Sequence, residues 1–225
     1  MKTLKNTIAI ALLIFVVSCS KKDEPAPPAE ESKLALPAAL SNNTMFLIPD
    51  ATSTNPNAYC GSDAQPGSVI SEIVIDKDGI IKDASKVTVE IDLEHKYGGE
   101  IIIELFAPNG ASCGLLKRAF SFSDNACLAS KGLKFISGNK LSFNSLFTDN
   151  FTLLLADKIV PTGNYKPTAA DAGTYPAAVL MTPLNTFFTG KNIKGIWKIK
   201  AYDCARDDSG KLNSWQIKFD TGALE

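Results

Sequence analysis

Short alternating runs of hydrophobic and polar residues recur along much of the chain. In "KVTVEIDL", the apolar residues Val87, Val89, Ile91 and Leu93 fall on one face of an extended strand, and polar residues fill the alternate positions. A period of two indicates a β-strand with one buried face. The other runs of this kind are "SVISEIVI", "EIIIELFA", "FTLLLA", "GIWKIKAY" and "SWQIKF".

Turn-forming segments separate these runs. "PNGA", "SGNK", "PTGNYKPTAADAG" and "DDSG" are rich in Gly, Pro, Asn and Asp. No stretch of ten or more residues has helical spacing with a cap, although "TYPAAVLMTPL" is compatible with a short helical turn. Many short strands joined by turns predict an all-β fold, a jelly-roll β-sandwich. In the last two runs apolar residues occupy both alternating sets, around Ile196 and around Trp197, which predicts strands buried on both faces.

The first 18 residues have the features of a signal peptide. Lys2 and Lys5 precede the apolar segment "TIAIALLIFVV", which is too short to span a bilayer as a lasting helix. The segment ends in "VVSC", which resembles the lipobox of bacterial lipoproteins and predicts lipidation of Cys19. Several acyl chains on Cys19 would hold the protein on a membrane. A plain secretory signal with an incidental cysteine is the alternative.

Residues 19–43 are predicted to form the lipidated start and a stalk. "SKKDE" directly after Cys19 resembles the export signal that sends some lipoproteins to the outer cell surface of Gram-negative bacteria. "PAPPAEESKLALPAAL" is Pro-rich and has little to bury, which is typical of an extended spacer. We therefore expect an outer-membrane protein that faces the cell exterior, with one domain at residues 44–225.

Cysteine usage fits an oxidising compartment. With Cys19 lipidated, an even number remains, and four cysteines allow three pairings of two disulfides. Cys113 and Cys127 bracket one segment, so a local bridge is expected there, which leaves Cys60 with Cys204. Zinc is the competing interpretation, but no C-x-x-C occurs and the spacings are irregular.

The charge balance narrows the range of partners. Lys and Arg number 23 and Asp and Glu number 24, for a formal net charge of −1. Without a basic excess or a long charge run, neither nucleic acid nor an anionic lipid surface is an expected partner. Contact with a membrane is expected only through the N-terminal lipid.

The ordered motifs of the mature region resemble those of the P domain, also called the Homo B domain, which follows the catalytic domain in proprotein convertases and many secreted bacterial subtilisin-like proteases. The resemblance begins at "FLIPD" and covers nearly the whole mature domain, except for residues 114–150. The matching positions are Ile91, His95, Gly99, Leu105, Pro108, Gly110, Phe187, Gly190, Gly195, Trp197, Asp203, Gly210, Leu212 and Trp215.

This resemblance implies a jelly-roll β-sandwich and a domain that packs against a protease catalytic domain. Gly195 and Gly210 are expected to supply backbone freedom at turns. Trp197 and Trp215 are expected in the core, with partners for their N–H groups. Two positions depart from the family pattern: Glu100 stands where the family has Asp, and "CARDD" is an unusual insertion.

Catalysis by the chain itself is not expected. A serine triad needs a base, and the one histidine, His95, stands where P domains carry a non-catalytic His. No G-x-S-x-G motif or phosphate-binding Gly-rich loop occurs. We expect His95 to be a structural residue.

A structural Ca²⁺ is the only cofactor that the sequence suggests. Asp203, Asp207 and Asp208 crowd one turn, and carboxylate oxygens are the ligands that Ca²⁺ requires. Pairing of Cys60 with Cys204 would bring the oxygens of Ser62 and Asp63 to the same end of the domain. The alternative is an Asp-rich turn closed by Asx hydrogen bonds.

The sequence thus favours a non-catalytic binding module on the cell surface. Its partner would be a protein or a glycan, and the irregular segment from Pro161 to Ala178, with Tyr165 and Tyr175, is the candidate contact loop. The alternative is an accessory domain that stabilises a separate subtilisin-like protease.

Overall fold

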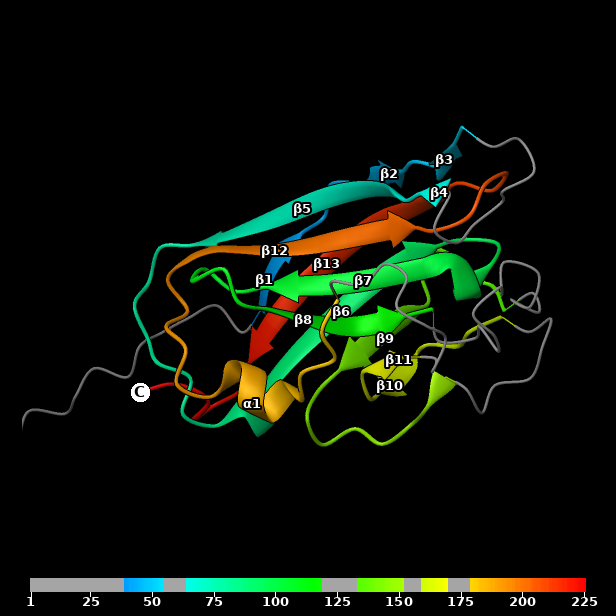
Figure 1. The fold of residues 1–225 in the computed structure, drawn as a ribbon. Helices are drawn as coiled ribbons and strands as arrows, with labels where there is room; N and C mark the ends of the chain where they lie inside the picture. Colours follow the sequence, from blue (N-terminus) through cyan, green and yellow to red (C-terminus); the bar gives the residue numbers. More distant parts are fainter. Residues whose placement is uncertain (1–38, 55–63, 119–132, 152–158, 170–178) are drawn as a thin grey trace, which may run out of the picture. The chain divides into compact units, whose positions relative to one another are not determined.

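A computed structural model describes the chain as a β-sandwich of two sheets (Figure 1). The residues that it describes are 39–54, 64–118, 133–151, 159–169 and 179–225. The predicted signal peptide, Cys19 and most of the predicted stalk lie outside these residues, so they stay predictions. Among the helices of the described residues, none combines the length and apolar character needed to span a membrane.

The first sheet has the strand order β1-β13-β6-β9-β10, and β2 also pairs with β13. Its strands are β1 (Ala39–Asn42), β2 (Phe46–Ile48), β6 (Val87–Glu94), β9 (Lys140–Phe143), β10 (Gly163–Tyr165) and β13 (Gly210–Phe219). All pairs are antiparallel except β9 with β10.

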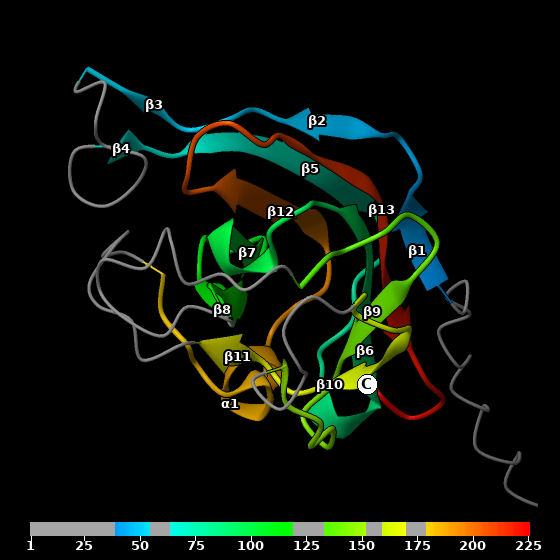
Figure 2. The ribbon, with the colours of Figure 1, turned by 90° about the vertical axis from the view of Figure 1, so that its right-hand side faces the viewer.

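The second sheet has the order β11-β8-β7-β12-β5. Its strands are β5 (Gly67–Ile75), β7 (Ile101–Phe106), β8 (Ser112–Lys117), β11 (Thr168–Ala169) and β12 (Gly195–Asp203). Figure 2 shows β7, β8 and β12 on one side and β6, β9 and β13 on the other. The remaining elements are β3 (Thr52–Ser53), β4 (Ala64–Gln65), α1 (Leu184–Phe188) and the 3-10 helices η1 (Ala84–Lys86) and η2 (Gly98–Glu100). The all-β class and the two-sheet sandwich are confirmed.

The core lies between the two sheets and follows the predicted alternation. The apolar set of β6 is fully buried, and so are the inward residues of β12 and β13. Trp197 donates its indole N–H to the carbonyl of Ile193 at 2.7 Å, and Trp215 donates to Ser71 Oγ at 2.9 Å. Both tryptophans are therefore core residues with satisfied N–H groups, as expected.

The prediction that the last strands are buried on both faces is wrong for β12. Ile196 is 41% exposed, and Val74, its partner on β5, is 68% exposed. Lysines at 198 and 200 fill the next outward positions of β12 and are half-buried. The outer face of this sheet is thus in contact with solvent, and the apolar Ile196 was a misleading signal.

Two details of the local prediction can be compared directly. The short helical turn considered for "TYPAAVLMTPL" does not form in the described part of this run, residues 179–183, and α1 includes only its last residue, Leu184. Gly195 has φ +124°, a conformation that favours glycine, and a Cβ there would meet Pro108 Cβ at 2.7 Å. The expected backbone freedom at Gly195 is confirmed.

Candidate functional site

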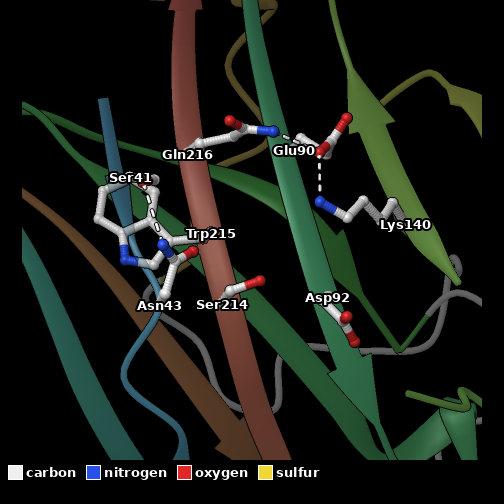
Figure 3. A pocket seen from close by; sticks show the side chains of 8 residues that line it. All are labelled: Ser41, Asn43, Glu90, Asp92, Lys140, Ser214, Trp215 and Gln216. Atoms are coloured by element: carbon white, nitrogen blue, oxygen red, sulfur yellow. Dashed lines mark hydrogen bonds and ion pairs between the residues drawn. The ribbon is translucent and has the colours of Figure 1, made fainter. Parts of the chain in front are cut away.

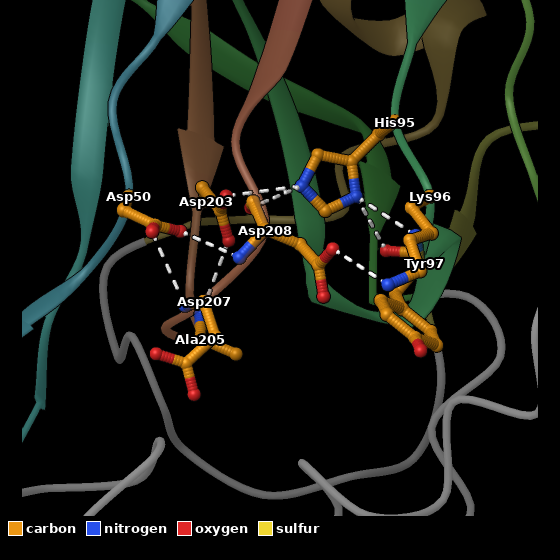
Figure 4. Close-up of polar contacts among 8 residues, drawn as sticks. All are labelled: Asp50, His95, Lys96, Tyr97, Asp203, Ala205, Asp207 and Asp208. Carbon is orange, nitrogen blue, oxygen red and sulfur yellow. Dashed lines mark hydrogen bonds and ion pairs between the residues drawn. The ribbon is translucent and has the colours of Figure 1, made fainter.

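His95 directly follows β6, and its side chain lies in the interior at one end of the sandwich (Figure 4). Its backbone pairs with Phe135 through two hydrogen bonds of 3.0 and 2.9 Å, which fix where the ring enters the core. Ring atom Nε2 lies 3.0 Å from Asp203 Oδ2 and 3.1 Å from the carbonyl of Asp208. Nδ1 lies 2.9 Å from the carbonyl of Tyr97.

Gly210 makes room for this ring. A Cβ at Gly210 would lie 2.6 Å from His95 Cδ2 and 2.8 Å from the Glu94 carbonyl, which is closer than real Cβ contacts come. The sequence analysis assigned Gly210 to backbone freedom, whereas the structure shows that close packing against the imidazole requires glycine here. That reason could not be read from the sequence, because His95 is far away along the chain.

His95 and Asp203 form a buried pair, with both side chains at 0% exposure. Burial alone lowers the pKa of His95, but the hydrogen bond and charge of Asp203 outweigh burial, so the pKa is raised. Burial raises the pKa of Asp203, and His95 opposes that shift. The pKa values of both groups are therefore raised, which favours the protonated form of each. The expectation of a structural, hydrogen-bonded His95 agrees with this geometry.

Glu100 ends η2 at the start of β7 and is only 6% exposed. Its Oε2 atom is buried and has no hydrogen-bond partner. Burial, supported by the nearby carboxylates of Asp203, Asp208 and Asp50, raises the pKa of Glu100 to about 8, although His95 opposes this shift. Glu100 thus brings an acidic group into the interior with one oxygen left without a hydrogen-bond partner.

The Asp-rich turn after β12 is held by carboxylate-to-backbone hydrogen bonds. The backbone N–H groups of Asp207 and Asp208 each donate to the carboxylate of Asp50 at 3.1 Å, and the N–H of Ala205 donates to Asp203 Oδ1 at 3.2 Å (Figure 4). Lys96 Nζ lies 3.0 Å from Asp208 Oδ1. The contact of Ala205 with Asp203 is an Asx hydrogen bond of the kind expected as the alternative to calcium, whereas Asp50 holds the turn from a distant part of the chain.

The three aspartates of the predicted calcium site lie in different settings. Asp203 points into the interior toward His95, while the backbone of Asp207 and Asp208 turns around Asp50. Within the described part of the chain, the one group of three possible metal ligands whose donor atoms come within 4.8 Å of one another is His95, Glu100 and Asp203. Calcium binding by the turn itself stays a prediction.

The two cysteines that the structure describes are both free and buried. Burial raises the pKa of the Cys204 thiol to about 12 and that of Cys113 still further. Their expected partners, Cys60 and Cys127, lie outside the described residues, so the structure does not bear out either bridge and the pairing stays a prediction. Counting free thiols in the unreduced, unfolded protein decides it: none is expected, because lipidation also converts the Cys19 thiol to a thioether.

Tyr165 is not a surface contact residue, contrary to expectation. It is 4% exposed, stacks on Phe151 at 4.0 Å between ring centroids, and donates its O–H to the Pro161 carbonyl at 2.9 Å. The ring is buried because β10 pairs with β9 and places Tyr165 opposite Phe143 in the core. Tyr175 lies outside the described residues.

The outer face of the first sheet has a polar hollow of about 200 Å³ (Figure 3). Ser41, Asn43, Glu90, Asp92, Lys140, Ser214, Trp215 and Gln216 line it. Glu90 accepts from Lys140 Nζ at 3.1 Å, from Lys218 Nζ at 2.9 Å and from the Gln216 amide. Trp215 is 1% exposed, so it offers no ring face for stacking a sugar.

Sequence reasoning missed Glu100 and Asp50 as members of the cluster around His95. The available signals were weak: Glu100 stood out as a departure from the family's Asp and as one of three acids near His95 that could equally face water, and Asp50 only as the last residue of "FLIPD". The hollow around Glu90 was also missed. The one sequence signal for this hollow was the polar residues on the outward face of the "KVTVEIDL" run.

The two-sheet sandwich has the fold that the resemblance to P domains implies, and a comparison with family models agrees over part of the chain. The family model described as "Proprotein convertase P-domain" matches residues 167–219. The resemblance found in the sequence is therefore confirmed over the part of the chain that contains β12 and β13. P domains are non-catalytic accessory domains of proteases.

Solved structures give only distant similarities. A complex of the Aeromonas sobria serine protease with its chaperone has 16% identity and a TM-score of 0.32, with 83% of this chain and 28% of that chain covered. The serine protease of Aeromonas sobria has 15% identity and a TM-score of 0.33, with 84% and 28% covered. This chain thus spans about 28% of their length, and the similarity is too low to assign a function. A comparison with curated proteins finds no significant match.

Proposed function

We propose that this chain is a non-catalytic P-domain module that binds a protein partner at the bacterial surface, where the lipid on Cys19 anchors it. The main observation behind this proposal is the burial of His95. Its ring and the carboxylate of Asp203 are both fully buried, so the one histidine of the chain cannot reach a substrate as a general base. A histidine–aspartate pair, which performs catalysis in many enzymes, here joins the ends of β6 and β12 in the core.

An apolar patch supports binding to a protein. Ile70, Val74 and Ile196 are 48%, 68% and 41% exposed on the outer face of the β5–β12 pair, and Val74 stands opposite Ile196. Adjacent exposed apolar side chains on a sheet face are typical of protein contact surfaces. The ion pair of Lys198 with Glu72 at 2.8 Å lies between Val74 and Ile70 on this face, so Val74 and Ile196 form the apolar centre and the charged pair borders it.

The test is cross-linking and co-purification of the full-length protein from cell envelopes. One partner protein, recovered in stoichiometric amount, is expected. Val74→Glu should abolish recovery, whereas Leu146→Glu, which changes an equally exposed leucine elsewhere, should not. Recovery of glycan alone, or of no partner, would refute the proposal. A Cys19→Ala variant, released from the membrane fraction, would confirm the anchor separately.

A separate subtilisin-like protease is the second candidate for the partner's identity. The match of residues 167–219 to the proprotein convertase P-domain favours it. If it is right, the recovered partner is a serine protease whose half-life at elevated temperature shortens when this chain is removed. An unchanged half-life would leave the binding module with a partner of another kind.

A further inference from the structure

His95, Glu100 and Asp203 bring three metal-ligating side chains to one buried point. Their exposures are 2%, 6% and 0%, and one donor atom from each lies within 4.8 Å of the others. The residues come from three different places: the end of β6, η2 and the end of β12. A ligand at this point would tie both sheets together.

An independent observation points to a ligand there. Glu100 Oε2 is buried without a hydrogen-bond partner, and an acceptor left in this state costs about 1–3 kcal/mol. Folded proteins rarely leave such an atom unsatisfied unless an ion or a water molecule fills the gap. The atom that lacks a partner belongs to the same group of three.

The charges around the cluster favour a cation. Asp203, Asp208 and Asp50 all act electrostatically on Glu100, and His95 is the one cation among its main electrostatic neighbours. Lys96 lies outside, more than half exposed and paired with Asp208. Arg118 is buried nearby, and its Nε donates to the Gly99 carbonyl at 3.2 Å. Among the main electrostatic neighbours of Glu100, three are carboxylates and one is an imidazole.

We propose that His95 Nε2 and the carboxylates of Glu100 and Asp203 bind a divalent transition metal ion of the Zn²⁺ class. One imidazole and two carboxylates form a donor set that suits Zn²⁺, and Ca²⁺ prefers oxygen ligands alone. The Asp208 carbonyl, 3.1 Å from Nε2, is placed to complete the coordination. This ligand set differs from the Asp-rich turn predicted to bind calcium, since Asp203 alone is common to both.

The surroundings of His95 are suited to a ligand. Nδ1 lies 2.9 Å from the carbonyl and 3.0 Å from the N–H of Tyr97, so this residue orients the ring in either tautomer. A metal on Nε2 would select the tautomer in which Nδ1 carries the proton and donates it to the Tyr97 carbonyl. Donor atoms around a tetrahedral Zn²⁺ stand about 3.4 Å apart, as ligand distances near 2.1 Å require. Nε2 and Asp203 Oδ2 are 3.0 Å apart, and an oxygen of Glu100 lies within 4.8 Å of both, so small side-chain movements suffice for binding.

The test uses the full purified chain, stripped with a chelator and dialysed against Zn²⁺ or Co²⁺ under reducing conditions. We expect one equivalent of bound metal, visible d–d absorption for the Co²⁺ form and a higher Tm on binding. Glu100→Gln should weaken the affinity by at least about 10- to 100-fold. Glu94→Gln, on the exposed end of β6, makes the same chemical change and should bind metal like the parent.

Several outcomes would overturn the proposal. Absence of stoichiometric metal would do so, and so would binding that Glu100→Gln leaves unchanged, because the metal would then sit elsewhere. Retention of Ca²⁺ but not of Zn²⁺ would favour the Asp-rich turn instead. If Glu100→Gln fails to fold, Glu100→Asp replaces it: a shortened carboxylate should retain the Co²⁺ absorption at weaker affinity. Metal binding is measured without any partner protein, so failure here leaves the proposed partner binding untouched.

Discussion

Glu90 and Glu100 place the same side chain in opposite surroundings within one sandwich. Glu90 projects from the outward face of β6, where Lys140, Lys218 and the amide of Gln216 converge on its carboxylate. Figure 3 shows the contacts with Lys140 and Gln216. Glu100 lies in the interior beside the pair of His95 and Asp203, and one of its oxygens has no partner. One carboxylate is surrounded by donors, and the other is surrounded mainly by other acids.

Their pKa values move in opposite directions for this reason. Burial raises the pKa of Glu90, but its hydrogen bonds with Lys218, Lys140 and Gln216 outweigh burial and hold the pKa below its usual range. At Glu100 burial dominates and the pKa rises to about 8. The folded chain alone supplies Glu90 with the hydrogen-bond donors that it needs. Glu100 needs a proton, a water molecule or a cation in addition.

The largest effect is expected from removing the partner of the buried acid. His95→Ala leaves the carboxylate of Asp203 in the interior without its imidazole, and loss of one member of a buried pair typically costs about 3–5 kcal/mol. Urea unfolding in the presence of a chelator measures this cost. Lys96→Ala, which removes the exposed neighbour from the same end of the sandwich, should change stability little. A loss at His95 as small as that of the control would show that Asp203 finds another donor.

The next effect tests the packing that holds His95 in place. Gly210→Ala forces a methyl group against the imidazole and the Glu94 carbonyl, and overpacking of this kind costs about 1–3 kcal/mol. The Co²⁺ affinity should fall in parallel, because the ring that supplies Nε2 must shift. Ser209→Ala, one residue earlier and exposed, is the control. Unchanged stability in Gly210→Ala would mean that the ring has space to withdraw.

The sequence could predict the region around β6 much better than the region around Glu100. The period of two placed Val87, Val89 and Ile91 in the core, and the fold class followed from such runs. It could not place Ile196, because an apolar residue on the outward face is not distinguishable by period from a buried one. The cluster depends on contacts between residues far apart, such as His95 with Asp203, and on a glutamate that turns inward. No local pattern contains that information.

The pH dependence of stability should differ in sign between the two glutamates. The folded chain without metal keeps a proton on Glu100 between pH 4.5 and about 8, and the unfolded chain releases it. The free energy of unfolding therefore falls as pH rises through this range, by at most about 1.4 kcal/mol per pH unit. The raised pKa of His95 acts in the same direction above pH 6.5, and that of Asp203 does so above pH 3.8.

Urea titrations in chelator at several pH values test this slope. Glu100→Gln removes the contribution of Glu100. The free energy of unfolding should therefore fall less steeply toward pH 8 in this variant than in the parent or in Glu94→Gln. A slope that survives in Glu100→Gln would assign the proton to His95 and Asp203 instead. The lowered pKa of Glu90 has the opposite consequence: its stabilisation is present above pH 4.5 and is lost as pH falls further.

The smallest effect is expected at Glu90. Glu90→Gln keeps the shape of the side chain but removes the negative charge that Lys140 and Lys218 share, and ion pairs with one partner near the surface contribute about 0.5–1 kcal/mol. Because the hollow opens to solvent, salt should reduce this difference, and urea unfolding at low and high ionic strength measures it. Co²⁺ binding should remain that of the parent. If Glu90→Gln instead lowered the metal affinity as Glu100→Gln is expected to do, the two carboxylates would be coupled through the β6 strand, and the contrast between a complete site and an incomplete one would fail.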